Sequence, residues 1–407
     1  MKKSFKNILC NKSAAYLNSL CYEISERSAG SEGNRAATAF FKNELTSLGW
    51  QTEVQGFNAL DWKENGAALQ VGEGNFEVFV SPYSLGCDIT AEIVNAGNIR
   101  ELEIVNAEGR IPLLHDELAK EQLMPKNFIF YNPDTHKQII NRLEKSGAQA
   151  IICATGRNSA VAGGEYPFPL IEDGDFDIPS VYMTEEEGQR LLACKSDRAV
   201  LRSFSERLPG RGFNVIGKKG SSASERIVIT AHIDAKKGTP GAIDNGTGVV
   251  ILLLAAELLK DYSGNKQVEI TALNGEDNFA VPGQMIYLSA NQNKFHTMLL
   301  TINIDGAGYK EGLTAFSFFN LPDKILGKAE KVLKSYQGIT EGVPWSQGDH
   351  SIFIRQGVPA VAVSSEWLIK NMDSQNITHT SKDNISIVDW EKLVETAEAI
   401  AEFIQKL

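Results

Sequence analysis

From residue 213 onward, short apolar runs alternate with helical patterns, and this alternation limits the possible folds more than any other feature. The apolar runs lie at 225–234, 267–277, 298–308 and 358–365, and the helical patterns at 245–262 and 389–407. Nearly continuous apolar strands that alternate with helices are typical of a mixed, largely parallel sheet with helices on both faces. The sequence therefore predicts an α/β fold whose ligand site lies beyond the carboxyl ends of the strands.

The 407 residues are enough for two or three domains. Near the N-terminus, two amphipathic patterns flank the turn-like ERSAGSEGN, and Gly49 follows the second in a C-cap position. The texture then changes to short buried-strand candidates around the helical pattern HKQIINRLEKS. We therefore divide the chain into an N-terminal part of the main domain (1–84), an inserted, mainly-β domain (85–203) and the rest of the main domain (204–407).

The composition, 43% apolar and 22% charged, is that of a globular protein, and the net charge of −11 argues against nucleic acid or an anionic membrane as partner. The five cysteines are scattered without a C-x-x-C pair, which favours a reducing compartment. The start MKKSFKNILC lacks the apolar run of a signal peptide, and no window approaches a transmembrane span. We predict a cytoplasmic protein and leave its oligomeric state open.

Polar side chains gather where the predicted strands end or where a helix begins. Seven residues have this placement or lie in the C-terminal segment THTSKDN: His232, Asp234, Asp244, Glu276, Asp277, Asp305 and His379. Taken singly, each has an ordinary structural explanation; Asp244, for example, could cap a helix. Because the carboxyl ends of parallel strands meet at one edge of a sheet, we expect nearly all of them to lie together.

Two imidazoles and several carboxylates suit Zn²⁺ or another divalent ion of similar preference. So many carboxylates would repel one another, and two dications would neutralise them. In a two-metal hydrolase one carboxylate stays off the metals and acts as general base. Of the adjacent pair Glu276 and Asp277, one can bind metal while the other accepts a proton.

The stretch ITAHIDAKKGTPGAIDNGTG, followed in order by LNGED, NIDGAG, GDHSIFIRQGVPAV and THTSKDN, resembles the M28 family of co-catalytic zinc aminopeptidases. The insert, with NFIFYN, GAQAIICAT and IPSVYMTEEEG, is similar to a protease-associated (PA) domain. The resemblance implies the zinc-peptidase fold and removal of the first residue from peptides with a free N-terminus. It also implies two divalent metal ions, Zn²⁺ first, with Co²⁺ or Mn²⁺ as alternatives.

Metal ligands follow from the resemblance residue by residue. It implies that His232 and Asp305 hold one metal. Asp277 and His379 would hold the other, and Asp244 would bridge the two.

Catalytic roles follow in the same way, together with two departures from the family pattern. The resemblance implies that Glu276 is the general base and that Asp234 orients a metal-bound histidine ring. The family usually has Glu where Asp277 stands, so a shorter side chain must reach the metal. The family commonly has Tyr near the oxyanion, where this chain has Trp345. We expect Trp345 or His350 at the substrate or oxyanion position. The alternative for His350 is a purely structural role within its loop.

Other functions remain open at this stage. Related folds act as carboxypeptidases or cyclise N-terminal glutamine, and a carboxypeptidase usually needs an arginine, for which Arg355 is an uncertain candidate. A non-catalytic binding protein that has lost its metals is a third possibility. Such proteins typically lose ligands, whereas this chain has a suitable residue at all five metal positions and keeps Glu276.

Overall fold

The chain forms two compact units. The structure, a computed structural model, describes all residues except 1–2, 25, 129–130, 159–162, 222–224 and 279–281. Unit 1 comprises Met1–Ala59 and Arg211–Leu407, and unit 2 comprises Leu60–Gly210. Two long strands, β1 (Gln51–Val71) and β8 (Arg198–Gly220), continue from one unit into the other.

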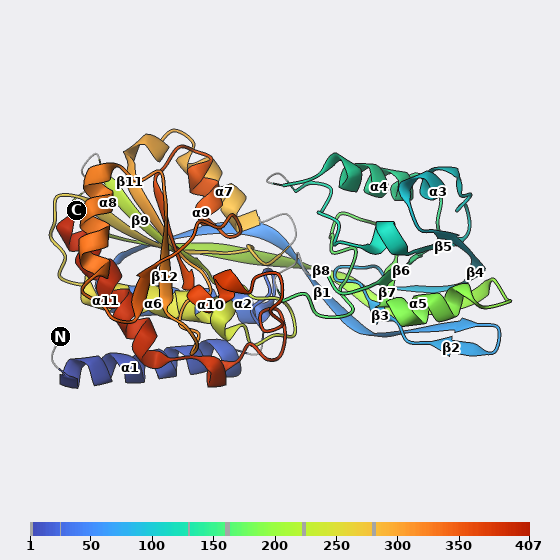
Figure 1. Ribbon diagram of the computed structural model, residues 1–407, viewed down its shortest axis with the longest axis horizontal. Helices are drawn as coiled ribbons and strands as arrows, with labels where there is room; N and C mark the ends of the chain where they lie inside the picture. The colour runs from blue at the N-terminus through green and yellow to red at the C-terminus, as the bar shows by residue number, and fades with distance from the viewer. Residues whose placement is uncertain (1–2, 25, 129–130, 159–162, 222–224, 279–281) are drawn as a thin grey trace. The chain divides into compact units, whose positions relative to one another are not determined.

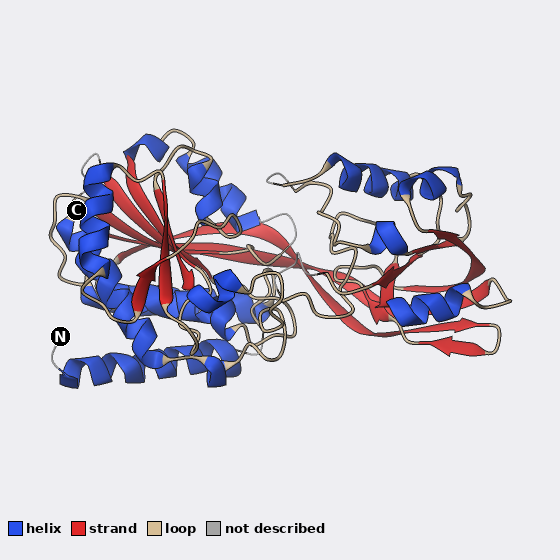
Figure 2. Ribbon diagram, in the orientation of Figure 1, coloured by secondary structure: helices blue, strands red, loops and turns tan. Residues whose placement is uncertain are grey.

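Unit 1 is built on a mixed, largely parallel sheet (Figure 2). Besides β1 and β8, its strands are β9 (Arg226–His232), β10 (Gln267–Leu273), β11 (Met298–Ile304), β12 (Thr314–Phe319), β13 (Ile339–Glu341) and β14 (Ala360–Ser365). They run in the order β13-β12-β14-β11-β9-β10-β8. The central strands β14, β11, β9 and β10 are parallel, whereas β12 and β8 are antiparallel to their neighbours β14 and β10. The predicted fold class is confirmed.

Helices cover both faces of this sheet (Figure 1). The longer ones are α1 (Lys3–Asn18), α2 (Glu32–Ser47), α6 (Thr247–Leu258), α7 (Pro282–Asn291), α8 (Asp323–Leu333) and α11 (Trp390–Lys406). Shorter helical segments are η1 (Ser19–Glu23), η3 (Ala242–Gly246), η4 (Phe295–Thr297), α9 (His350–Ile354), α10 (Glu366–Lys370) and η5 (Ile385–Ile387). No helix within the described ranges is long and apolar enough to cross a membrane.

The apolar helix α6 lies at the centre of one helical layer. Its residues from 249 to 256 are all buried, because α1, α2 and α11 pack around it. On the other face, the rings of Tyr287 in α7 and Phe353 in α9 lie 5.8 Å apart. Gly49 lies just past the end of α2 with a φ of 74°, in the left-handed conformation expected after a helix.

Unit 2 contains the strands that continue this hydrogen-bonded order beyond β8. Its strands are β2 (Gly74–Phe76), β3 (Phe79–Val80), β4 (Cys87–Ala96), β5 (Ile111–Leu114), β6 (Ile151–Thr155) and β7 (Ser180–Thr184). Its helices are α3 (Ile99–Ile104), η2 (Asp116–Ala119), α4 (Asp134–Glu144) and α5 (Glu185–Leu192). Strands β4 to β7 are parallel to one another, β3 is antiparallel to β7, and β8 is antiparallel to β4.

The sequence boundaries 85 and 203 differ from those of the compact unit because β1 and β8 cross its borders without a break. The strand candidate NFIFYN (127–132) begins in a turn at Asn127, and residues 129–130 lie outside the described part of the chain. The likeness of this unit to a PA domain stays a prediction.

The last helix has a strong N-cap, which gives a stability prediction. The side chain of Asp389 accepts hydrogen bonds from the backbone N–H groups of Glu391 and Lys392. Asp389→Ala should lower the free energy of unfolding by about 1 kcal/mol because it leaves these N–H groups without their acceptor. Urea denaturation followed by fluorescence measures this change. The control Asp373→Ala, at an exposed loop position of the same unit, should change it by about 0.5 kcal/mol or less; equal effects would contradict the capping role.

Candidate metal centre and active site

Neighbouring parallel strands bring the predicted residues to one edge of the unit 1 sheet. His232 is the last residue of β9, and Asp305 follows β11 directly. Glu276 and Asp277 follow β10 after a short turn. Because β10 and β11 both pair in parallel with β9, the three strands end at the same edge.

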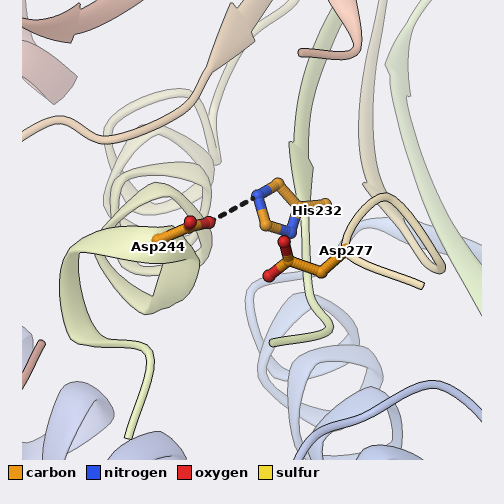
Figure 3. Close-up of side chains that lie close together, drawn as sticks. All are labelled: His232, Asp244 and Asp277. Atoms are coloured by element: carbon orange, nitrogen blue, oxygen red, sulfur yellow. Dashed lines mark ion pairs between the residues drawn. The ribbon is translucent and has the colours of Figure 1, made fainter. Parts of the chain in front are cut away.

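Asp244 completes a compact group with two of these residues. In His232, Asp244 and Asp277, one nitrogen or oxygen atom of each side chain lies within 4.8 Å of the others (Figure 3). His232 Nε2 lies 3.1 Å from Asp244 Oδ1 and 3.6 Å from Asp305 Oδ1. The carboxylates of Asp244, Asp277 and Asp305 thus lie around the imidazole of His232.

His379 joins the group from the loop before α11. Its Nε2 lies 3.0 Å from Asp244 Oδ2 and 3.0 Å from Asp277 Oδ1. The two oxygens of Asp244 therefore face two different histidines. Of the seven residues that the sequence singled out at strand ends and loops, the five predicted metal ligands are brought together here.

The histidine His232 is oriented as a metal ligand needs to be. Its Nδ1 lies 3.2 Å from the backbone carbonyl oxygen of Asp234, which can only accept a hydrogen bond. Nδ1 therefore carries the hydrogen, and Nε2 offers its lone pair to the cluster. Nε2 is buried and has no well-directed hydrogen bond, and the same holds for Asp277 Oδ2.

The electrostatics of the cluster fit a divalent cation. Although burial opposes a charged imidazole, the nearby carboxylates of Asp234, Asp244 and Asp305 raise the pKa of His232 well above its usual value. Burial and the charge of Asp244 raise the pKa of Asp277. Without a metal, these carboxylates and imidazoles stay close together by sharing protons. A metal ion can displace those protons and bind the same nitrogen and oxygen atoms. The residues present therefore fit a metal.

Glu276 lies beside the cluster, and the charged groups of the cluster affect its pKa. Burial raises the pKa of Glu276 well above its usual value; the charge of His232 opposes this shift, and those of Asp305 and Asp277 add to it. A raised carboxyl pKa suits a group that both accepts and donates a proton near neutral pH.

Asp234 does more than face a histidine ring. Its carboxylate lies 3.8 Å from His232 Nδ1, but its hydrogen bonds go to the turn that carries the acidic pair. It accepts from the backbone N–H groups of Gly275 at 2.7 Å and Asp277 at 3.0 Å, and from the side chain of Asn278 at 2.7 Å. One buried carboxylate thus links the end of β9 to the turn after β10.

Trp345 lies in a loop next to Asp305, and His350 is the first residue of α9, which follows that loop. A Cβ atom at Gly348 would lie 2.8 Å from Asp305 Oδ2 and 3.3 Å from the Trp345 ring. His350 Nε2 donates to the backbone oxygen of Trp345 at 2.9 Å, and the two rings lie 4.5 Å apart. Burial lowers the pKa of His350. The ring of His350 is therefore held within its own loop, as in the structural alternative, and its role toward substrate stays a prediction.

Asp383 was not singled out from the sequence. It is fully buried, and its carboxylate accepts from the backbone N–H groups of Ile243 at 2.6 Å and Asp244 at 3.0 Å. Burial and the charge of Asp244 raise the pKa of Asp383 to about 7. Its only sequence signal was its place four residues after His379 in THTSKDN.

Comparison with known proteins settles the family. Residues 214–404, which contain every predicted ligand, match the model of peptidase family M28. These residues belong to peptidase family M28. The predicted enzyme class of the M28 chain, a metallopeptidase and hence a hydrolase, is confirmed by this membership.

Several known proteins are similar to this chain over most of its length. It is 21% identical to Aminopeptidase YwaD of Bacillus subtilis (strain 168) over 404 residues, which span 94% of this chain and 82% of the relative. Its structure resembles that of an aminopeptidase from Aneurinibacillus sp. strain AM-1, with a TM-score of 0.77, 20% identity and coverage of 98% and 93% of the two chains. It also resembles BSAP, a zinc aminopeptidase from Bacillus subtilis, with a TM-score of 0.75, 19% identity and coverage of 98% and 95%. These structural likenesses establish the fold.

The contacts of Asp383 predict that it supports the metal centre. Asp383→Asn keeps one oxygen acceptor but not two, so one N–H group of the segment that ends in Asp244 loses its acceptor. We expect Zn²⁺ affinity to fall about 10- to 100-fold, as measured by titration of metal-free protein against a competing chelator. The exposed neighbour Ser381 supplies a control, and Ser381→Ala should bind like wild type. Unchanged affinity in Asp383→Asn would remove this role.

Proposed function

We propose that this chain is an aminopeptidase that uses two divalent metal ions, Zn²⁺ first, to remove the N-terminal residue of peptides. One observation carries the proposal. Asp244 Oδ1 faces His232 Nε2 at 3.1 Å, and Asp244 Oδ2 faces His379 Nε2 at 3.0 Å. A carboxylate whose two oxygens face two separate histidines is the arrangement expected of a bridge between two metals.

The remaining contacts support one ligand set on each side of this bridge. Asp305 approaches His232, with Oδ1 3.6 Å from Nε2, and would share the first metal with it. Asp277 approaches His379, with Oδ1 3.0 Å from Nε2, and would share the second. The shorter side chain of Asp277 thus reaches the cluster, which supports its acting in place of the usual Glu.

Glu276 is the general base in this proposal. When bound, the two ions lower the pKa of a water molecule and polarise the scissile carbonyl. Glu276 accepts the proton of that water as its oxygen attacks the carbonyl carbon. Glu276 then gives the proton to the departing nitrogen, so that one water is consumed and a free amino acid and a shortened peptide are released.

A substrate with a free N-terminus suits this site. The support for it comes from the compared relatives, because the two ions would already balance the carboxylates at this edge. The compared relatives carry aminopeptidase names. The cytoplasmic location and the absence of nucleic-acid and membrane partners stay predictions from the sequence.

The alternatives have less support. A carboxypeptidase needs a cation for the substrate carboxylate, whereas the described cluster consists of carboxylates and imidazoles. Arg355, the sequence candidate for that cation, follows α9 directly as its C-cap residue. A non-catalytic binding protein would have no need of Glu276 beside five ligands.

Metal analysis and substrate choice test the function. Protein purified without chelator or metal-affinity tag should contain about two equivalents of Zn²⁺ or a similar ion. Chelation should abolish hydrolysis of aminoacyl-p-nitroanilides, and added Zn²⁺ or Co²⁺ should restore it. N-acetylated versions of the same substrates should not be cleaved, because they lack the α-ammonium group.

Other results would redirect the proposal. A single equivalent of metal with cyclisation of N-terminal glutamine would indicate a cyclase. Cleavage of blocked peptides from their C-terminus would indicate a carboxypeptidase. No metal after incubation with added Zn²⁺ would indicate a binding protein.

Exchange of the acidic pair separates its two roles. Glu276→Gln should lower kcat about 10²- to 10⁴-fold because an amide cannot accept the proton. Its metal content should stay near two equivalents. Asp277→Asn should instead lose one equivalent, and Asp277→Glu, which has the family's usual side chain, should keep both. Near-normal kcat in Glu276→Gln would overturn its assignment as base.

A further inference from the structure

The segment before α2 provides none of the predicted ligands, yet it contacts three segments that carry them. Arg27 lies in this segment and is 3% exposed. Its guanidinium donates to four backbone carbonyl oxygens, and Nη1 also lies 3.9 Å from Cys21 Sγ. A buried cation held in this way acts on the backbone path of the segments around it.

Two of those segments lead to predicted ligands. Arg27 Nε donates to the carbonyl of Ile233 at 3.2 Å, and Ile233 lies between His232 and Asp234. Arg27 Nη1 donates to Pro240 at 2.8 Å, and Nη2 donates to Gly241 at 2.7 Å. Gly241 precedes Asp244 by three residues. One planar group therefore joins the backbone next to His232 to the backbone that leads to Asp244.

A fourth bond anchors the guanidinium to the helical segment that precedes Arg27 in the chain. Arg27 Nη1 also donates to the carbonyl of Leu20 at 2.6 Å, in η1. Gly241 has a φ of 58°, and a Cβ atom there would lie 2.8 Å from Arg27 Nη2. The absence of a side chain at Gly241 is thus what allows the guanidinium to approach this closely.

Asn34 extends the connection to the third segment. Its Nδ2 donates to the carbonyl of Arg27 at 2.9 Å and to Asn274 Oδ1 at 2.9 Å. Asn274 returns a bond to Asn34 Oδ1 at 2.8 Å. Asn274 precedes Glu276 by two residues, and Asn34 is fully buried. The pair of amides therefore ties Arg27 to the turn that carries the acidic pair.

We infer that Arg27, supported by Asn34, is a positioning residue that sets the separation of His232 and Asp244 and so prepares the metal centre before metal binds. Arg27 can act in this way because it donates to the carbonyls of Ile233, next to His232, and of Gly241, three residues before Asp244. A lysine cannot replace it, because an ammonium lacks the planar fork that reaches several carbonyls at once. This inference rests on the metal centre of the proposed function.

A Co²⁺ titration tests the inference without using activity. Metal-free wild type, Arg27→Lys and Asn34→Ala are titrated with Co²⁺, and the visible absorption reports both affinity and coordination geometry. Arg27→Lys should bind Co²⁺ about 10- to 100-fold more weakly, with an altered spectrum. Asn34→Ala should show a smaller loss of affinity, because Arg27 remains in place.

Arg142→Lys is the matched control. Arg142 also uses its guanidinium on backbone carbonyls, those of Leu102 at 3.1 Å and Glu103 at 2.6 Å, but in unit 2. It should bind Co²⁺ like wild type. Thermal unfolding of the metal-free proteins shows whether each variant is folded.

The outcomes separate this inference from the proposed function. Wild type that binds no Co²⁺ removes the metal centre itself. Wild type that binds two ions, together with folded Arg27→Lys of equal affinity and spectrum, overturns only the role of Arg27. If Arg27→Lys does not fold, a folded Asn34→Ala with wild-type affinity overturns the inference. Loss of folding in both variants also overturns it, because the two residues would then support the whole fold.

Discussion

Mutual repulsion among buried carboxylates is the constraint on which the site depends. One nitrogen or oxygen atom of each of His232, Asp244 and Asp277 lies within 4.8 Å of the others, and His379 and Asp305 adjoin them. Two like charges 4 Å apart repel by about 4 kcal/mol at an effective dielectric constant of 20. Such a group stays together only if the backbone around it is held firmly and if cations or protons balance the charge.

The chain meets this constraint with a surrounding layer of side chains bonded to backbone. Asp234 and Asp383 accept from the N–H groups of the segments that carry the ligands. Arg27 donates to the carbonyls of two of the same segments. The carboxylates that are predicted to bind metal are thus held in place by residues that are not predicted to bind it.

The closeness of His232 and Asp305 could be predicted from the sequence, because the parallel-strand rule sends strand ends to one edge. His379 was noted in THTSKDN, and the family resemblance implied its place beside Asp277. The supporting residues could not be found in this way. Arg27 lies more than 200 residues from the carbonyls of Ile233 and Gly241 in the chain. Because every residue has a backbone carbonyl, no residue type in the sequence indicates which carbonyl will accept a hydrogen bond. The unit borders were also hidden, since β1 and β8 continue through them as strands with no loop composition to mark a division.

The course of β1 and β8 also bears on how such a chain can be rearranged over time. These strands pair with each other, and residues near the border of unit 1 on each lie in contact, since a Cβ atom at Gly56 would lie 3.2 Å from the ring of Phe213. Everything from Leu60 to Gly210 is therefore an elaborated connection between two strands that are already partners. A lineage could shorten, exchange or lose that connection by remaking one turn, while the edge of the sheet with the predicted metal site keeps its own hydrogen bonds.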